Sequence, residues 1–146
     1  MTLSKTLLAG LALAALAAAP AARAQETLGD LTLSFPGLAT KSGNVMIAVY
    51  DSAQGWTAGK AVRVAVASAS DAEPSAKISA LPTGTYAVRV FQDIDGDGKM
   101  SRNPFGLPTE PYGFSRDAMG AMGPPTFDDA AFQVKVGANA QALHLK

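Results

Sequence analysis

Residues 81–101 read LPTGTYAVRVFQDIDGDGKMS, and the rest of the chain is organised around this stretch. It begins with Leu81-Pro82-Thr83-Gly84-Thr85-Tyr86, which has the spacing of a tyrosine corner. In that corner the phenol hydroxyl bonds to the backbone a few residues upstream and fixes the start of a strand. The alternative is an ordinary hairpin turn followed by a buried tyrosine. Because strand patterns flank the turn on both sides, we expect the corner.

Short segments with strand patterns lie on both sides of the corner. Seven of them show alternating or continuous apolar residues: 31–35, 45–50, 62–66, 76–80, 87–91, 132–136 and 143–145. The continuous run 45–50 is typical of a central strand that is covered on both faces. Residues 51–55 read as a turn next to the single tryptophan, Trp56, and Gly137-Ala138-Asn139 separates the last two strands.

This pattern predicts an all-β fold. About seven short strands, with turn signals at close intervals, indicate an antiparallel sandwich of two sheets with immunoglobulin or transthyretin-like architecture. Thr126 followed by Phe127-Asp128-Asp129 is expected to cap one short helical turn before the sixth strand.

The first 24 residues have the features of a cleaved signal peptide. Lys5 supplies positive charge, residues 6–19 are apolar, and Ala22-Arg23-Ala24 offers small residues to a signal peptidase. The alternative, a membrane anchor, needs about 20 apolar residues. We therefore expect residues 25–146 to form a single β-sandwich domain, periplasmic or secreted, without membrane insertion.

Composition excludes several classes of function. Residues 25–146 carry 10 basic and 12 acidic side chains, a net charge of −2, which does not resemble a nucleic-acid-binding surface. The chain has no cysteine, so disulfides and lipoprotein attachment are excluded. Its only histidine, His144, is expected to face solvent on the side opposite Leu143 and Leu145. A hydrolase triad and a zinc site are therefore not expected.

A connection of about 37 residues, 93–129, separates the fifth strand from the sixth. Connections of this length are uncommon in a compact domain unless they are functional, disordered or tied down. The segment carries too much apolar surface to remain disordered. We expect an ordered loop that folds back over one end or face of the sandwich.

Three aspartates at alternate positions begin this loop and match the first half of a calcium-binding pattern. Asp93, Asp95 and Asp97 occupy its positions 1, 3 and 5. Gly98 stands at position 6, where a sharp turn is required, and the Lys99 carbonyl falls at position 7. Three carboxylates this close repel one another unless a cation compensates their charge. The loop is therefore predicted to bind Ca²⁺.

The pattern departs at position 12, which is Pro104 and offers no side-chain ligand. Asn103 or Glu110 is a candidate for the missing oxygen, and Ser101 could contribute through water. The alternative is a solvated acidic turn that is held by hydrogen bonds from the backbone to the aspartates.

Three runs carry a resemblance to a known family: FQDIDGDGK at 91–99, GLPTEPYGFS at 106–115 and PPTFDDA at 124–130. They resemble the exported bacterial family DUF2141, and the likeness covers nearly all of the chain after the signal segment. Many members of that family carry Asn where Asp95 or Asp97 stands here, which keeps an oxygen ligand and lowers the charge. No activity follows from the resemblance, because the family is named for lacking an assigned one.

Four aromatic residues in or near the loop have two interpretations. They form a binding platform for sugar or peptide, or they cover the end of the core, which is the commoner fate of large aromatics. The four are Trp56, Phe105, Tyr112 and Phe114.

The sequence as a whole favours a non-enzymatic exported protein with a calcium-binding loop. Recognition of an envelope ligand, either a glycan or a protein, is expected at the loop end. The alternative is an envelope enzyme that acts on glycan or peptide through Glu110 and the loop aspartates. A deep cleft with paired carboxylates would favour the enzyme, and a shallow or closed surface would favour the binding module.

Overall fold

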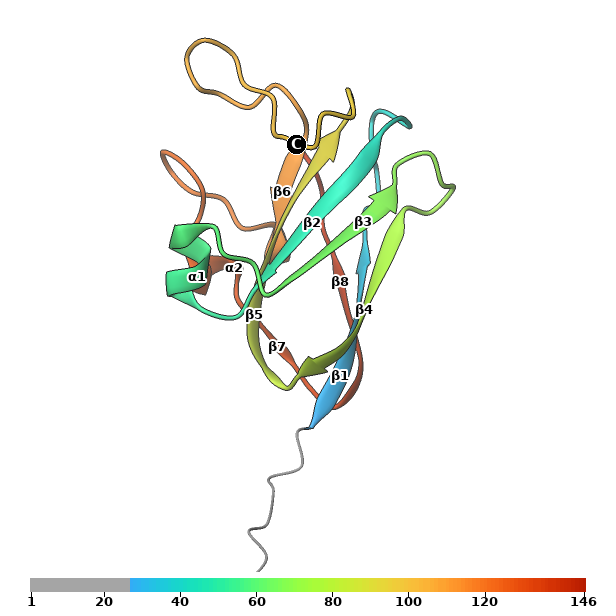
Figure 1. Ribbon diagram of the computed structural model, residues 1–146, viewed down its shortest axis with the longest axis vertical. Coiled ribbons are helices and arrows are strands. Elements are labelled where there is room, and N and C mark those ends of the chain that lie inside the picture. Colours follow the sequence, from blue (N-terminus) through green and yellow to red (C-terminus); the bar gives the residue numbers. More distant parts are fainter. Residues whose placement is uncertain (1–26) are drawn as a thin grey trace, which may run out of the picture.

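Two sheets pack against each other in the computed structural model, which describes residues 27–146 (Figure 1). The predicted signal peptide, residues 1–24, lies outside the described residues. The elements in chain order are β1 (Leu28–Ser34), β2 (Asn44–Tyr50), α1 (Ala53–Ala58), β3 (Arg63–Ser68), β4 (Ser75–Pro82), β5 (Gly84–Asp93), β6 (Tyr112–Phe114), η1 (Ser115–Asp117), α2 (Phe127–Ala130), β7 (Phe132–Val134) and β8 (Gly137–Ala142).

The strand order confirms the predicted two-sheet sandwich. The smaller sheet has the order β4-β1-β8, and the larger has the order β3-β2-β5-β6, with β7 also paired to β5. The apolar run of β2 lies between β3 and β5, so the prediction of a central strand is confirmed. Pairing is antiparallel except between β1 and β8, which run parallel.

The main core fills the space between the sheets. Alternate residues of each strand point into it, as the two-residue period of a strand requires. Its largest side chains that are almost inaccessible to solvent are Leu31, Leu33, Phe35, Val45, Val49, Leu81, Val88, Val134 and Leu143.

The predicted tyrosine corner joins the two sheets. β4 belongs to the smaller sheet and β5 to the larger, and only Thr83 separates them. The Tyr86 hydroxyl donates to the Pro82 carbonyl at 2.9 Å, and the ring of Tyr86 is buried. The corner is therefore confirmed, because an ordinary hairpin would have kept both strands in one sheet.

The last strand lies earlier than predicted. β8 includes residues 137–139, which the sequence pattern assigned to a connection, and it ends before Leu143. Its side chains are small or polar, so pairing with β1 forms this strand without any apolar alternation. Leu143 is nevertheless fully buried, and the His144 side chain is exposed as predicted.

Trp56 lies on a helix, so the prediction of a simple turn was incomplete. α1 begins after Ser52, whose hydroxyl accepts from the Gly55 N–H at 3.2 Å, and Gly59 caps its C-terminal end. Six residues are too few to show a helical period in the sequence.

The long connection from β5 to β7 contains β6, η1 and α2, so it is more structured than the sequence indicated. β6 is only three residues long and pairs with the edge of β5. The predicted capped turn is confirmed: the Thr126 hydroxyl accepts from the Asp129 N–H, and the Asp129 carboxylate accepts from the Thr126 N–H. Within residues 27–146, no helix has the length and hydrophobicity needed to cross a membrane.

Candidate metal-binding loop and aromatic end

The acidic loop begins where β5 ends. Asp93 is the last residue of β5 and is only 3% exposed, whereas Asp95 and Asp97 are exposed. Gly43 packs directly against the Asp93 carbonyl, at a φ of +72°, and no other residue would fit there. The backbone at Asp93 is therefore held in place by the neighbouring chain before β2.

The carboxylate of Asp93 closes the loop. Its Oδ1 accepts from the Gly96 N–H at 2.8 Å, and its Oδ2 accepts from the Gly98 N–H at 3.0 Å. Gly98 has a φ of +75°, a left-handed conformation that suits glycine, as the predicted sharp turn at this position requires.

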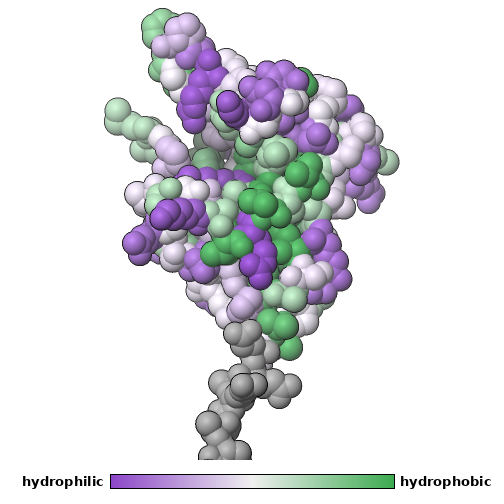
Figure 2. Space-filling view, in the orientation of Figure 1, coloured by the Kyte–Doolittle hydropathy of each residue, from purple (hydrophilic) through white to green (hydrophobic). Residues whose placement is uncertain are grey.

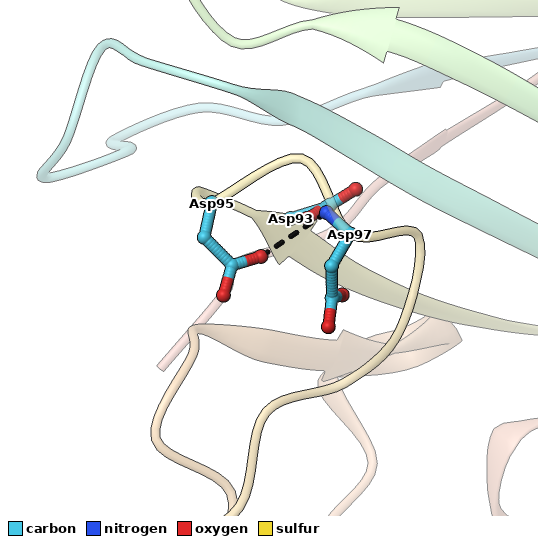
Figure 3. A group of neighbouring side chains, drawn as sticks. All are labelled: Asp93, Asp95 and Asp97. Carbon is cyan, nitrogen blue, oxygen red and sulfur yellow. Dashed lines mark hydrogen bonds between the residues drawn. The ribbon is translucent and has the colours of Figure 1, made fainter.

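The three carboxylates lie together (Figure 3). One oxygen from each of Asp93, Asp95 and Asp97 lies within 4.8 Å of the other two. Asp95 Oδ1 accepts from the Asp97 N–H at 3.2 Å, and Asp97 Oδ1 accepts from the Lys99 N–H at 2.7 Å. These bonds curl the chain so that the aspartates converge, and carboxylate oxygens retain lone pairs for a further ligand.

No basic side chain neutralises this cluster within the described part of the chain. The two ion pairs formed by residues 27–146 lie elsewhere, between Lys77 and Asp30 and between His144 and Asp117. Closely spaced carboxylates without a partner cation repel one another. Hard divalent cations prefer such an all-oxygen set.

Glu110 and Asn103 shape the loop through other contacts. The buried Glu110 accepts from the Ile94 N–H at 2.8 Å and from the Ser101 N–H at 2.9 Å, so it ties the two ends of the acidic loop together. Asn103 Oδ1 accepts from the N–H groups of Phe105 and Leu107, both at 3.0 Å. Glu110 lies outside the group of converging aspartates, and the side-chain oxygens of both residues accept hydrogen bonds from the backbone.

Two of the predicted recognition aromatics are buried in a second core. Trp56 and Phe114 are 4% and 8% exposed, and they pack with Tyr50 and Phe127 on the outer side of the larger sheet. The Trp56 ring N–H also donates to the Pro125 carbonyl at 3.0 Å. This placement matches the interpretation in which aromatics cover the end of the core.

The other two aromatics remain accessible. Phe105 is 89% exposed in the loop that follows the acidic cluster. Tyr112 is half-buried and meets Phe114 edge-on, with ring centroids 5.9 Å apart. Among the four predicted aromatics, Phe105 and Tyr112 are therefore the more accessible to a ligand.

Comparison with known proteins places the chain in a family. Residues 34–142 match the family described as uncharacterized protein conserved in bacteria, DUF2141. The chain belongs to this family. No match was found among curated proteins or among solved structures. The matched DUF2141 region contains the corner, the acidic loop and both accessible aromatics, so the resemblance seen in the sequence is confirmed.

One residue of this DUF2141 protein was not singled out from its sequence. Arg89 lies in β5 between the apolar Val88 and Val90, and its guanidinium carbon lies 3.9 Å from the centroid of the Trp56 ring. A single charge inside the apolar run AVRVF was the available signal. The sequence alone did not show which residues surround Arg89, because it did not define the outer face of the larger sheet.

Proposed function

We propose that this protein is an exported, non-enzymatic β-sandwich module, periplasmic or secreted, whose acidic loop binds Ca²⁺ and whose loop end recognises a ligand. The convergence of the Asp93, Asp95 and Asp97 carboxylates within 4.8 Å is the observation that supports the calcium site best. The cation would offset their repulsion and fix the position of the loop that follows.

The affinity expected for this site is modest. Pro104 offers no side-chain ligand at position 12, and Glu110 already accepts two backbone N–H groups. Fewer protein ligands leave more coordination positions to water. A dissociation constant on the order of 10⁻⁴ to 10⁻³ M, as in extracellular calcium modules, follows from this incomplete set.

The surroundings of Glu110 support a structural role for this residue. A general acid or base must reach a substrate proton, but Glu110 is 7% exposed and binds the backbone at both oxygens. We therefore favour a binding module over an envelope enzyme.

Thermal unfolding with EDTA, Ca²⁺ or Mg²⁺ tests the proposal. A ligand that binds only the folded state at about 100 times its Kd stabilises that state by about 2.7 kcal/mol. Ca²⁺ should raise the midpoint, and Mg²⁺ should act weakly because it requires strict octahedral geometry. Asp97→Ala should abolish the gain, whereas Asp71→Ala, which removes the same charge from an exposed turn, should retain it. A midpoint indifferent to millimolar Ca²⁺, with no heat on titration, would exclude the calcium site.

A further inference from the structure

The outer face of the larger sheet is apolar where an antiparallel sheet would ordinarily present polar groups to water. One row of cross-strand neighbours on this face runs Val66, Met46, Phe91, Tyr112 across β3, β2, β5 and β6. Val66 is 56% exposed. Figure 2 shows apolar side chains gathered over the middle of this face.

The adjacent row carries a single charge. It runs Val64, Ala48, Arg89, Phe114 across the same four strands, and Val64 is 77% exposed. Arg89 is therefore the only charged residue in the two rows, and it stands at their centre, in β5.

Two segments rise beside this face and make it concave. Residues 100–108 and 119–124 project from the same side of the molecule (Figure 1) and enclose, with the sheet, a hollow of about 1040 Å³. Leu107, Met119 and Met122 contribute exposed apolar side chains to these walls. We call this hollow the outer groove. Its volume matches the upper end of small-molecule sites, and flexible methionines allow such a site to adapt to its ligand.

The charge of the outer groove is positive. Arg89 and Arg102 are the only charged side chains that line it among residues 27–146, and no carboxylate does. The Arg89 guanidinium stacks on Trp56 and Tyr50 and donates one hydrogen bond, from Nη2 to the Trp56 carbonyl at 2.8 Å. Its Nε has no partner, and Arg89 forms no ion pair with any described residue.

A partly desolvated guanidinium without a counter-ion favours an anionic partner. Burial lowers the pKa of Arg89, and Tyr50 opposes part of this shift. A carboxylate presented to Arg89 would supply the missing counter-charge, while the surrounding rows would bury an apolar chain. The two requirements together describe an amphiphile with an acidic head.

We propose that the outer groove binds a free fatty acid, with its carboxylate at Arg89 and its alkyl chain along the apolar face between the two wall segments. This inference deepens the recognition half of the proposed function and does not depend on the calcium site. A second copy of this chain is the other occupant to consider. The concave shape favours a small ligand that enters the groove. The sheet face of a second copy would meet the projecting segments before it reached the floor of the groove.

Calorimetric titration with dodecanoate tests the proposal, with dodecanol as the uncharged probe of equal chain length. EDTA in all samples keeps calcium out of both the loop and the fatty acid. Dodecanoate should bind the wild-type protein with a one-to-one stoichiometry, about tenfold or more tightly than dodecanol. Arg89→Met should lower the dodecanoate affinity to that for dodecanol. Arg63→Met, which removes an exposed arginine outside the groove, should leave both affinities unchanged.

A second variant keeps the test decisive if Arg89→Met does not fold. Val66→Asp places a negative charge on the exposed apolar row and should abolish dodecanoate binding. The proposal is overturned if the wild type shows no saturable binding, or if folded Arg89→Met or Val66→Asp binds as the wild type does. It is also overturned if sedimentation shows a ligand-free dimer that Val66→Asp dissociates, because the groove would then be an interface between copies. Dodecanoate binding without a response to Ca²⁺ would reject only the calcium site. A response to Ca²⁺ without dodecanoate binding would reject only the fatty-acid site.

Discussion

At the scale of single residues, the tyrosine corner is the contact that the sequence defined best. Tyr86→Phe keeps the buried ring and removes the hydroxyl that donates to the Pro82 carbonyl. The free energy of unfolding should fall by about 1 kcal/mol, the net contribution of one such hydrogen bond. Urea unfolding measures this loss, and Tyr112→Phe, on a half-buried ring, is the matched control. An unchanged Tyr86→Phe would mean that the ring acts by packing alone.

Asp117 gives the molecule a defined pH dependence. The His144 backbone N–H donates to Asp117 Oδ1 at 2.9 Å, and the His144 ring Nδ1 lies 2.8 Å from Oδ2. The backbone hydrogen bond, more than the ring, lowers the pKa of Asp117, while burial opposes the shift. A carboxyl with a lowered folded-state pKa stabilises the fold above its unfolded pKa of about 3.9 and loses this effect as the pH falls through the folded value.

We therefore expect Asp117→Asn to be less stable than the wild type at about pH 5, with a difference that shrinks as the pH falls below about 4. Urea unfolding of both proteins across this range checks the expectation. Asp71→Asn, in an exposed turn, is the matched control for the loss of one carboxylate. A difference for Asp117→Asn that stays constant with pH would show that its carboxylate charge is not responsible.

At the scale of elements, Ser115 attaches the segment from η1 to α2 to the larger sheet. Its fully buried hydroxyl donates to the Ala130 carbonyl at 2.6 Å and accepts from the Val88 N–H at 2.9 Å. Ser115→Ala removes both bonds and leaves buried groups without partners, so unfolding should become easier by about 2 kcal/mol. Hydrogen exchange should also speed up across residues 115–131. Ser79→Ala, on an exposed strand position, should change neither quantity, and an equally small effect at Ser115 would contradict this role.

Strands with a clear apolar pattern were predictable from the sequence. Strands that form because of their backbone pairing with a neighbour were missed. β2 and β5 have near-continuous apolar sequences and were found. β8 contains only small and polar residues, and β6 is only three residues long. Pairing with β1 and with β5, rather than a pattern in their own sequences, makes these two segments strands. Helix α1 is shorter than the window in which a helical period can be recognised.

At the scale of the whole molecule, the sequence located the acidic loop but not its surroundings. The spacing of the aspartates was enough to predict their convergence, because alternate positions in a tight loop point inward. Glu110 reaches the backbone of Ile94 and Ser101 because the chain reverses between them, and Arg89 stands alone among apolar neighbours because of the strand register. No local sequence pattern encodes either arrangement. β3 shows the same limit: its valines face outward, and its alanines face the core.

An NMR titration of the ¹⁵N-labelled protein tests most directly the proposed binding of Ca²⁺ to the loop formed by Asp93, Asp95 and Asp97. Added Ca²⁺ should shift the backbone amides of residues 93–101, above all those of Gly96, Gly98 and Lys99, which donate to the carboxylates of Asp93 and Asp97. The shifts should saturate together with a Kd on the order of 10⁻⁴ to 10⁻³ M. Amides of the loop that stay in place at millimolar Ca²⁺, or shifts confined to other parts of the chain, would contradict the account.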